Sequence, residues 1–316
     1  MTATVPSSSA STSEPLDIAG GLAIGDIVRD GDVHVHGNVS DTVSILTRGK
    51  IAIDGVCSAS RVEAGSTLAV SGGIKGAGRA TYRAAGNISA HYIENATVET
   101  EANVLIDSEA LNNRLVCAGR VIIHGALVAG HTIATGGVRC RVLGSPLGNA
   151  RTILEVGLDP ALQAAAPGAL EQIQSRLAKA AKLRATVAPI MRNQRWLTAQ
   201  QKEEATELLF QADELEHEAN QILTRMRALI EAADKRSLPR IRVMTLLHPP
   251  VTIRMPGLEA DIHQELHGPL WIAPRGIGRN QYLAIIKSGR ITTPLNTRTT
   301  PDPVLTELRK LLVNPA

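Results

Sequence analysis

The segment Val33–Gly37 reads V-H-V-H-G, and variants of this short phrase return along residues 31–157. The first and third residues of each phrase are mostly apolar, which is the alternation of a strand with one buried face. The fourth residues of successive phrases lie 12 to 20 positions apart, a spacing typical of the rungs of a β-solenoid. The phrases after V-H-V-H-G are I-A-I-D-G (51–55), L-A-V-S-G (68–72), I-S-A-H (88–91), V-L-I-D (104–107), V-I-I-H-G (121–125) and I-A-T-G (133–136).

Each rung adds a second apolar patch after its phrase, as at Val43 and Ile45 or at Leu115 and Cys117. A rung near 17 residues is longer than the hexapeptide-based rung of left-handed helices. The pattern therefore predicts a right-handed parallel β-helix over residues 21–160, mainly β in class. Small residues between the patches predict corners where the backbone needs a positive φ angle: Gly31, Gly49, Gly65, Gly86, Asn103, Gly119 and Gly130.

The composition supports a narrow solenoid. Hydrophobic residues make up 44% of the chain and charged residues 20%, so a sizeable core is available. Aromatic residues are only 2% beside 27 glycines. A globular core usually depends on large aromatic side chains, whereas stacked Val, Ile, Leu and Ala with glycine corners need few of them.

The net charge and the cysteines indicate which kind of partner the chain binds and in which cellular compartment it works. A net charge of +3 does not predict a nucleic-acid partner. Cys57, Cys117 and Cys140 lack metal-ligand spacing, and we expect them to be reduced and to face the core. Residues 1–20 predict a disordered Ser/Thr tail without the features of a signal peptide, and no apolar run is long enough for a membrane span. We expect a cytoplasmic protein.

The periodicity changes after Asp159-Pro160 and Pro167-Gly168, which we expect to end the stack. Residues 168–236 predict an antiparallel coiled-coil hairpin, with its tip near residues 193–198. Thr198 and Gln201 have the spacing of a capping box that starts the second helix. An apolar seam with steps of four and three residues then follows: Gln201, Ala205, Leu208, Ala212, Leu215, Ala219, Ile222, Met226, Leu229 and Ala233.

Short strands resume after the hairpin. Residues 239–291 predict a C-terminal β segment that returns to the solenoid or caps it. Residues 292–316 are rich in Pro and Thr and predict a tail with a short helix over Val304–Leu312.

The fourth phrase positions predict an outward column of His36, Asp54, Ser71, His91, Asp107 and His124. A metal site or an acid–base pair could be drawn from such residues. An exposed ladder that avoids stacking like charges is the simpler interpretation, so we expect no metal and no cofactor. The glycine-rich G-G-I-K-G-A-G-R at residues 72–79 lacks the Lys-Ser/Thr of a phosphate-binding loop and predicts a wide corner. No motif indicates catalytic residues.

Arg195, Trp196 and Leu197 lie at the predicted hairpin tip. An aromatic and an aliphatic residue there either pack locally or contact a partner protein. This tip is the one candidate partner-binding site that the sequence suggests.

Four longer stretches resemble the flagellar assembly protein A family, and the resemblance continues to about Ile272. Members commonly carry a further domain ahead of the β-helix, where this chain has its short Ser/Thr segment. The glycine–valine rungs alone are also similar to bactofilins and to the C-terminal domain of the MinC division inhibitor. The stretches are G-G-I-K-G-A-G-R (72–79), H-Y-I-E-N-A-T-V-E (91–99), R-V-L-G-S-P-L-G (141–148) and T-I-L-E-V-G-L-D-P (152–160).

The resemblance implies a bacterial cytosolic scaffold or adaptor, without enzymatic activity or a small-molecule substrate. Such a protein would organise a flagellar, polar or envelope-associated assembly through protein–protein contacts. Two alternatives stay open: a bactofilin-like protein that polymerises through exposed end rungs, and a β-helix enzyme that acts on a polysaccharide. A homo-oligomer fits either of the first two hypotheses.

Overall fold

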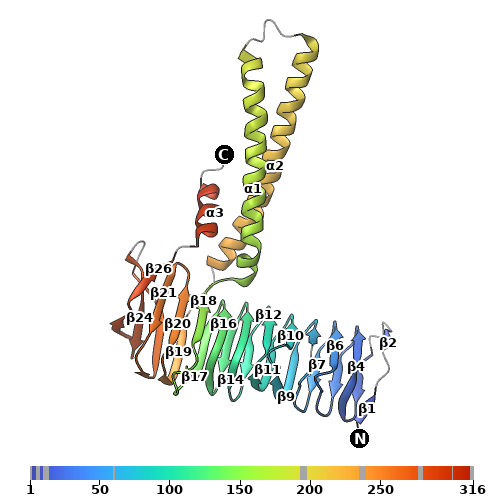
Figure 1. The fold of residues 1–316 in the computed structure, drawn as a ribbon, viewed down its shortest axis with the longest axis vertical. Helices are drawn as coiled ribbons and strands as arrows, with labels where there is room; N and C mark the ends of the chain where they lie inside the picture. The colour runs from blue at the N-terminus through green and yellow to red at the C-terminus, as the bar shows by residue number, and fades with distance from the viewer. Residues whose placement is uncertain are drawn as a thin grey trace. The chain divides into compact units, whose positions relative to one another are not determined.

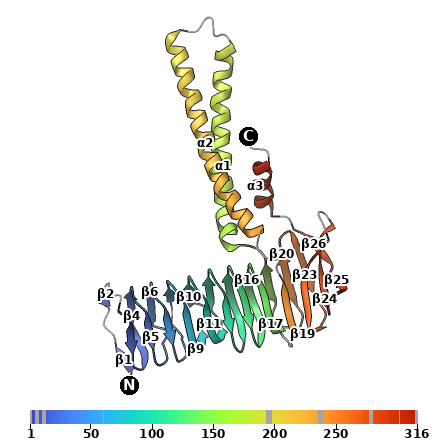
Figure 2. The same cartoon turned by 180° about the vertical axis from the view of Figure 1, so that it is seen from behind.

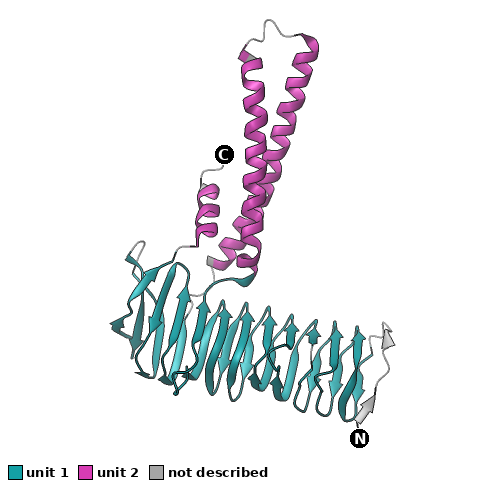
Figure 3. Ribbon diagram, viewed as in Figure 1, with its two compact units in different colours: residues 1–160, 236–300 teal, residues 161–235, 301–316 magenta. Residues whose placement is uncertain are grey.

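The computed structural model describes residues 2–4, 8–9, 14–59, 61–192, 198–234, 240–276, 280–300 and 302–313. The chain forms two compact units (Figure 3). One unit comprises residues 1–160 and 236–300, and the other comprises residues 161–235 and 301–316. Each unit is described separately below.

The first unit is a parallel β-helix, which confirms the predicted fold class (Figure 1). Before the helical insertion, paired strands of neighbouring rungs lie 16 to 22 positions apart, for example 17 between Leu16 and Val33. The strands are β1 (Thr2–Thr4), β2 (Ser8–Ser9), β3 (Leu16–Ile18), β4 (Gly21–Arg29), β5 (Val33–Val35), β6 (Val43–Thr47), β7 (Ile51–Ile53), β8 (Arg61–Ala64), β9 (Leu68–Lys75), β10 (Thr81–Ala84), β11 (Ile88–Glu94), β12 (Thr97–Thr100), β13 (Val104–Ile106), β14 (Ala110–Cys117), β15 (Arg120–Ile123), β16 (Ala126–Ala134), β17 (Gly137–Leu143), β18 (Thr152–Val156), β19 (Ile241–Leu247) and β20 (Val251–Met255).

The strand pairing defines three faces of the solenoid, each a stack of parallel strands from successive rungs. On each face, the residues that point inward lie one above another and form a buried column. Stacking these columns gives a continuous core that no single rung could form alone. Face 1 contributes Val33, Ile51, Leu68, Ile88, Val104, Val121, Val138 and Ile241. Face 2 contributes Ile45, Val62, Tyr82, Val98, Leu115, Thr132, Leu154 and Ile253. Face 3 contributes Leu22, Val39, Cys57, Ile74, Ile93, Ala110, Leu127, Leu143 and Leu247.

Cys57 lies in the column of face 3, and Cys117 and Cys140 are further inward residues of faces 2 and 1. All three are buried, as the sequence predicts. Burial raises the pKa of the Cys57 thiol to about 11 and that of the Cys117 and Cys140 thiols to about 12. The thiols therefore stay protonated near neutral pH and are inert core groups.

The seventh predicted phrase, Ile133–Gly136, was assigned to the wrong face. Ile133 pairs with Val116 and Glu155 on face 2. The true continuation of face 1 is Val138, which pairs with Val121 and restores a 17-residue step. The apolar–polar alternation is the same on faces 1 and 2, so a two-residue pattern alone does not tell them apart.

The corner glycines are required for a different reason than predicted. Gly130 has a φ of +79°, but Gly49, Gly65 and Gly119 have no positive φ. Instead, a Cβ atom on Gly65 would lie 2.3 Å from the Arg48 carbonyl oxygen, and one on Gly119 would lie 2.4 Å from that of Ala102. Successive rungs therefore approach backbone to backbone at these corners, where a side chain has no space. The corner predicted over Gly72–Arg79 is only partly correct: Gly72–Lys75 belong to strand β9, and the turn itself covers residues 76–79. This rung has 20 residues between Leu68 and Ile88.

We predict that Gly65→Ala lowers the free energy of unfolding by about 1–3 kcal/mol, because the added methyl group meets backbone atoms that cannot move aside. The measurement is urea unfolding followed by circular dichroism. Gly168→Ala is the matched control, since a Cβ on this helical glycine meets nothing within 4 Å. It should raise helix stability by about 0.5–1 kcal/mol. A neutral Gly65→Ala variant would contradict the proposed backbone contact.

The helical hairpin is an insertion within one turn of the solenoid. Val138 pairs in parallel with Ile241, although 103 positions separate them in sequence. Glu155 of β18 and Arg254 of β20 connect the two sides of this insertion, with Arg254 Nη1 donating to the carboxylate at 3.0 Å. Arg254 Nε also donates to Glu259 at 2.7 Å, and His131 Nε2 lies 3.0 Å from Glu155. The interactions with His131 and then Arg254 hold the pKa of Glu155 below its ordinary value.

This carboxylate should make part of the stability pH-dependent. Because its pKa is lower in the folded state, its contribution is complete above the unfolded pKa and is lost as the pH falls through the folded pKa. We predict that Glu155→Gln costs about 1–2 kcal/mol at neutral pH and loses less stability than the wild type between about pH 5 and pH 3. Urea midpoints across that range are the measurement. The exposed Glu101→Gln is the control, and equal acid slopes in all three proteins would contradict the prediction.

Antiparallel strands cover the C-terminal end of the solenoid. Strand β19 pairs with β22 and β23, and strand β20 pairs with β21. All three faces therefore end on strands of opposite direction, which removes the open parallel edge there. The added strands are β21 (Leu258–Ile262), β22 (Leu266–His267), β23 (Leu270–Arg275), β24 (Tyr282–Lys287), β25 (Arg290–Pro294) and β26 (Thr297–Thr299).

The second unit contains α1 (Pro160–Arg192), α2 (Ala199–Asp234) and α3 (Pro303–Val313). Helices α1 and α2 lie side by side in both views (Figure 2). Arg176 forms an ion pair with Glu218, and Arg184 with Glu216, in antiparallel order. The predicted capping box is confirmed: the Gln201 backbone NH donates to Thr198 Oγ1 at 3.3 Å, and the Thr198 NH donates to Gln201 Oε1 at 3.1 Å.

Buried residues at seven-residue steps, most of them alanines, form the seam between these helices. Leu229, which was predicted to lie in the seam, is 38% exposed. Leu223 and Ile230, which were not predicted there, are buried. Leu308 of α3 packs in the same cluster. The buried positions are Ala166, Ile173, Ala180 and Val187 in α1, and Ala205, Ala212, Ala219 and Met226 in α2.

Several element boundaries differ from the expected ones. Strands β1, β2 and β3 lie within the expected tail. Strands β1 and β2 pair with β4, and Leu16 and Ile18 of β3 continue the apolar columns of Val33 and Val35. Helix α1 begins at Pro160 and contains Pro167, which does not end an element. Strand β26 lies within the expected C-terminal tail, and helix α3 confirms the short helix predicted there over Val304–Leu312.

Candidate binding surface

The predicted hairpin-tip residues Arg195, Trp196 and Leu197 lie outside the described residues. The outward surface of face 1 instead carries two groups of charged and aromatic side chains, one near each end of the solenoid.

The predicted outward column from His36 to His124 forms, with one register shift at His91, between Ala90 and Tyr92. Backbone hydrogen bonds connect Asp54 to Val35, Asp107 to Ala90 and His124 to Ile106, each one rung earlier. Within the column, His36 Nδ1 lies 2.9 Å from Asp54, and His124 Nδ1 lies 3.6 Å from Asp107. Neighbouring histidines and aspartates therefore alternate, as the ladder interpretation predicts.

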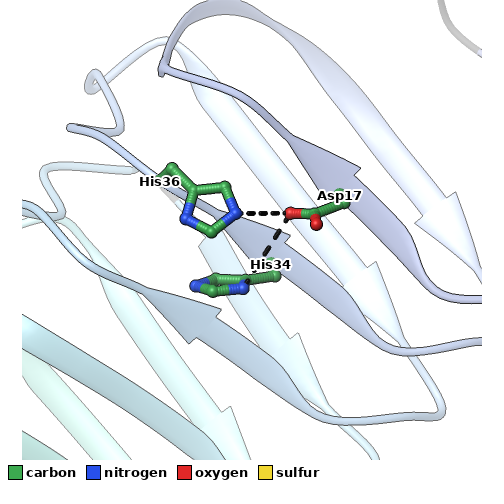
Figure 4. A group of neighbouring side chains, drawn as sticks. All are labelled: Asp17, His34 and His36. Atoms are coloured by element: carbon green, nitrogen blue, oxygen red, sulfur yellow. Dashed lines mark ion pairs between the residues drawn. The ribbon is translucent and has the colours of Figure 1, made fainter.

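Four residues at the N-terminal end form what we call the histidine cluster: Asp17, His34, His36 and Asp54. His34 and His36 leave strand β5 on the same side, two residues apart, and their ring centroids are 4.0 Å apart. Asp17 lies on β3, one rung earlier, and Asp54 follows β7, one rung later. Figure 4 shows both histidines directed toward the carboxylate of Asp17.

The charges in this cluster stabilise one another. The hydrogen bond with Asp54, together with that to Asp17, raises the pKa of His36 above its ordinary value. His34 and then His36 hold the pKa of Asp54 below its ordinary value.

The other end of face 1 carries a shallow cavity of about 400 Å³ that we call the arginine pocket. Its polar lining is basic, and none of the described residues that line it is acidic. Arg139, Arg242 and Trp271 stand opposite one another on the adjacent strands β17, β19 and β23. The named members of the pocket are Arg120, Arg139, Arg240, Arg242 and Trp271.

The arginines of this pocket lack carboxylate partners. In the part of the chain that the structure describes, none of the four guanidinium groups forms an ion pair, and Arg242 Nε is buried without an acceptor. Trp271 accepts the cations instead: the Arg242 guanidinium carbon lies 4.7 Å from the ring centroid and that of Arg240 lies 6.0 Å away. Placing Arg139 directly opposite Arg242 is repulsive, so this surface is suited to an anionic group.

Sequence reasoning missed the arginine pocket. Arg120 and Arg139 precede the helical insertion, whereas Arg240, Arg242 and Trp271 follow it. The available signal was R-I-R-V at residues 240–243, where two arginines alternate with apolar residues on one strand.

A comparison with protein families matches residues 21–273 to the Flagellar Assembly Protein A beta solenoid domain, FapA. The match covers 253 of the 316 residues. The chain belongs to this family. This confirms the resemblance seen in the sequence and identifies a flagellar assembly-related protein. No curated protein and no solved structure matches the chain.

The FapA match covers the arginine pocket and three members of the histidine cluster, whereas Asp17 precedes the matched residues. Across the described residues, no helix is both long enough and apolar enough to cross a membrane. The family is one of assembly proteins; that this chain lacks enzymatic activity and needs no cofactor stays a prediction.

Proposed function

We propose that this FapA-family chain is a non-enzymatic cytoplasmic adaptor that holds a protein partner of a flagellar or envelope-associated assembly on face 1 of its solenoid. The observation that carries the proposal is the arginine pocket. Four arginines and Trp271 line it, and none of the described lining residues is acidic.

The chemistry of the pocket favours an acidic segment of a partner protein. Arginine binds carboxylates in a bidentate manner, and arginine and tryptophan dominate the binding energy of protein interfaces. The Arg242 Nε atom is desolvated without an acceptor, so a carboxylate that reaches it would satisfy a hydrogen bond that the chain itself leaves unmade. The basic residues form one local group rather than a continuous stripe, which supports a protein segment over a nucleic acid.

In the native host, deletion of the chain's gene is predicted to reduce the number of flagella per cell, counted by electron microscopy, and the full-length chain should restore it. The Arg139→Glu variant should not restore the number, because a carboxylate in the pocket would repel an acidic partner. Arg290→Glu, which changes an exposed arginine on β25 outside the pocket, is the matched control and should restore it.

Both variants should keep the unfolding midpoint of the wild type, which separates lost binding from lost folding. Normal flagellation in the deletion strain would contradict the assembly role. Full restoration by Arg139→Glu would exclude the arginine pocket as the partner surface.

A bactofilin-like polymer is the second candidate, and the C-terminal end of the solenoid argues against it. Strands β21, β22 and β23 run antiparallel to the rungs that they cover, so a second solenoid cannot continue the parallel ladder there.

Sedimentation velocity of the full-length protein distinguishes the two candidates. We predict one discrete species, a monomer or a small homo-oligomer, whose sedimentation coefficient stays constant over a wide concentration range. A broad series of large species that grows with concentration would instead favour the polymerising scaffold.

A further inference from the structure

The histidine cluster has the donor arrangement of a metal site. His34 Nδ1 and His36 Nε2 both face Asp17 Oδ1, at 3.9 and 2.7 Å, respectively. These three atoms all lie within 4.8 Å of one another. Donors around a tetrahedral zinc ion are about 3.3 Å apart, so small side-chain rotations would bring all three within bonding distance of one ion.

Asp54 completes the arrangement from the opposite side. Its Oδ1 lies 3.1 Å from His34 Nε2, and its Oδ2 lies 2.9 Å from His36 Nδ1. The two ring nitrogens that face away from Asp17 are thereby bonded to one carboxylate. Metal-bound histidines commonly donate their second N–H group to a carboxylate, which orients the ring and fixes its tautomer. An ordinary ladder of alternating charges does not require this pairing of both nitrogens of both rings.

We propose that the N-terminal rungs bind a divalent transition-metal ion of the zinc class through Asp17 Oδ1, His34 Nδ1 and His36 Nε2, with Asp54 as the orienting carboxylate. Two imidazoles and one carboxylate suit zinc. The side chains of Asp17 and His36 are 71% and 41% exposed, so a fourth position stays open to water. This proposal reverses the expectation from sequence that the column binds no metal.

A second pair of residues in the same column can be compared with this site. Asp107 and His124 occupy the same column, at adjacent rungs. The residues that correspond to His34 on those rungs are Leu105 and Ile122. This second pair therefore has a carboxylate and an imidazole in the column but lacks the second histidine, and we expect it to bind zinc weakly.

The test is isothermal titration of the full-length, tag-free protein with Zn²⁺ alone at neutral pH. We expect one Zn²⁺ per chain and an unfolding midpoint that rises with Zn²⁺ concentration. His34→Ala and Asp17→Asn should each abolish the stoichiometric binding. Asp54→Asn should keep one site but weaken its affinity by about 10–100-fold, because it removes only the orienting carboxylate.

His124→Ala is the matched control and should bind one Zn²⁺ with wild-type affinity. Each variant is first compared with the wild type in metal-free buffer, where an unchanged unfolding midpoint shows that the solenoid is intact. If His34→Ala were to unfold, Asp54→Asn would still test the site. The Asp54 side chain is 47% exposed, and its ion pairs are with His34 and His36, so its replacement should leave the solenoid folded. Absence of stoichiometric Zn²⁺ binding, or its retention in His34→Ala, would overturn the proposal.

Discussion

Contact between the backbones of successive rungs is the constraint on which this molecule depends. At corners such as Gly65, the chain lies against the carbonyl oxygen of the rung before it, closer than any side chain would allow. This approach keeps the parallel ladder in register, and the register in turn places each inward residue on the residue one rung earlier. The core columns, the outward column and the two groups of face 1 are consequences of the same repeat.

The sequence predicted the repeat well because inward positions tolerate little variation. Val33, Ile51 and Leu68 face the core at equivalent positions of successive rungs. Their alternation with outward-facing neighbours can be recognised from the sequence alone. Face 3 was not assigned from sequence, since it contributes short stretches, such as the single bridge at Cys57. The reason for the corner glycines was also misjudged, because close approach between rungs depends on residues about 17 positions away, which local backbone preferences do not include.

The candidate sites also contain contacts that the sequence could predict and contacts that only the structure shows. The His36–Asp54 contact was predictable because both residues occupy one phrase position on consecutive rungs. Asp17 was missed because β3 lies within the segment expected to be disordered. The arginine pocket needed the structure for a stronger reason: Arg139 and Arg242 become neighbours only once the insertion is recognised as leaving and re-entering the same turn. Sequence separation across an inserted hairpin carries no information about this pairing.

The outward residues of face 1 show how one architecture accommodates different chemistry. The same strand position holds Asp17, His34, Ala52, Ala69, Ser89, Leu105, Ile122, Arg139, Arg242 and Trp271 in consecutive rungs. These side chains can vary without disturbing the strand pairing, because they point outward. The residues before and after each of them in the strand point inward and remain apolar. Acidic and imidazole groups therefore gather at one end and guanidinium groups at the other, with small and apolar residues between. Like charges opposite one another cost stability, so the juxtaposition of Arg139 and Arg242 supports the proposal that this surface binds an anionic segment.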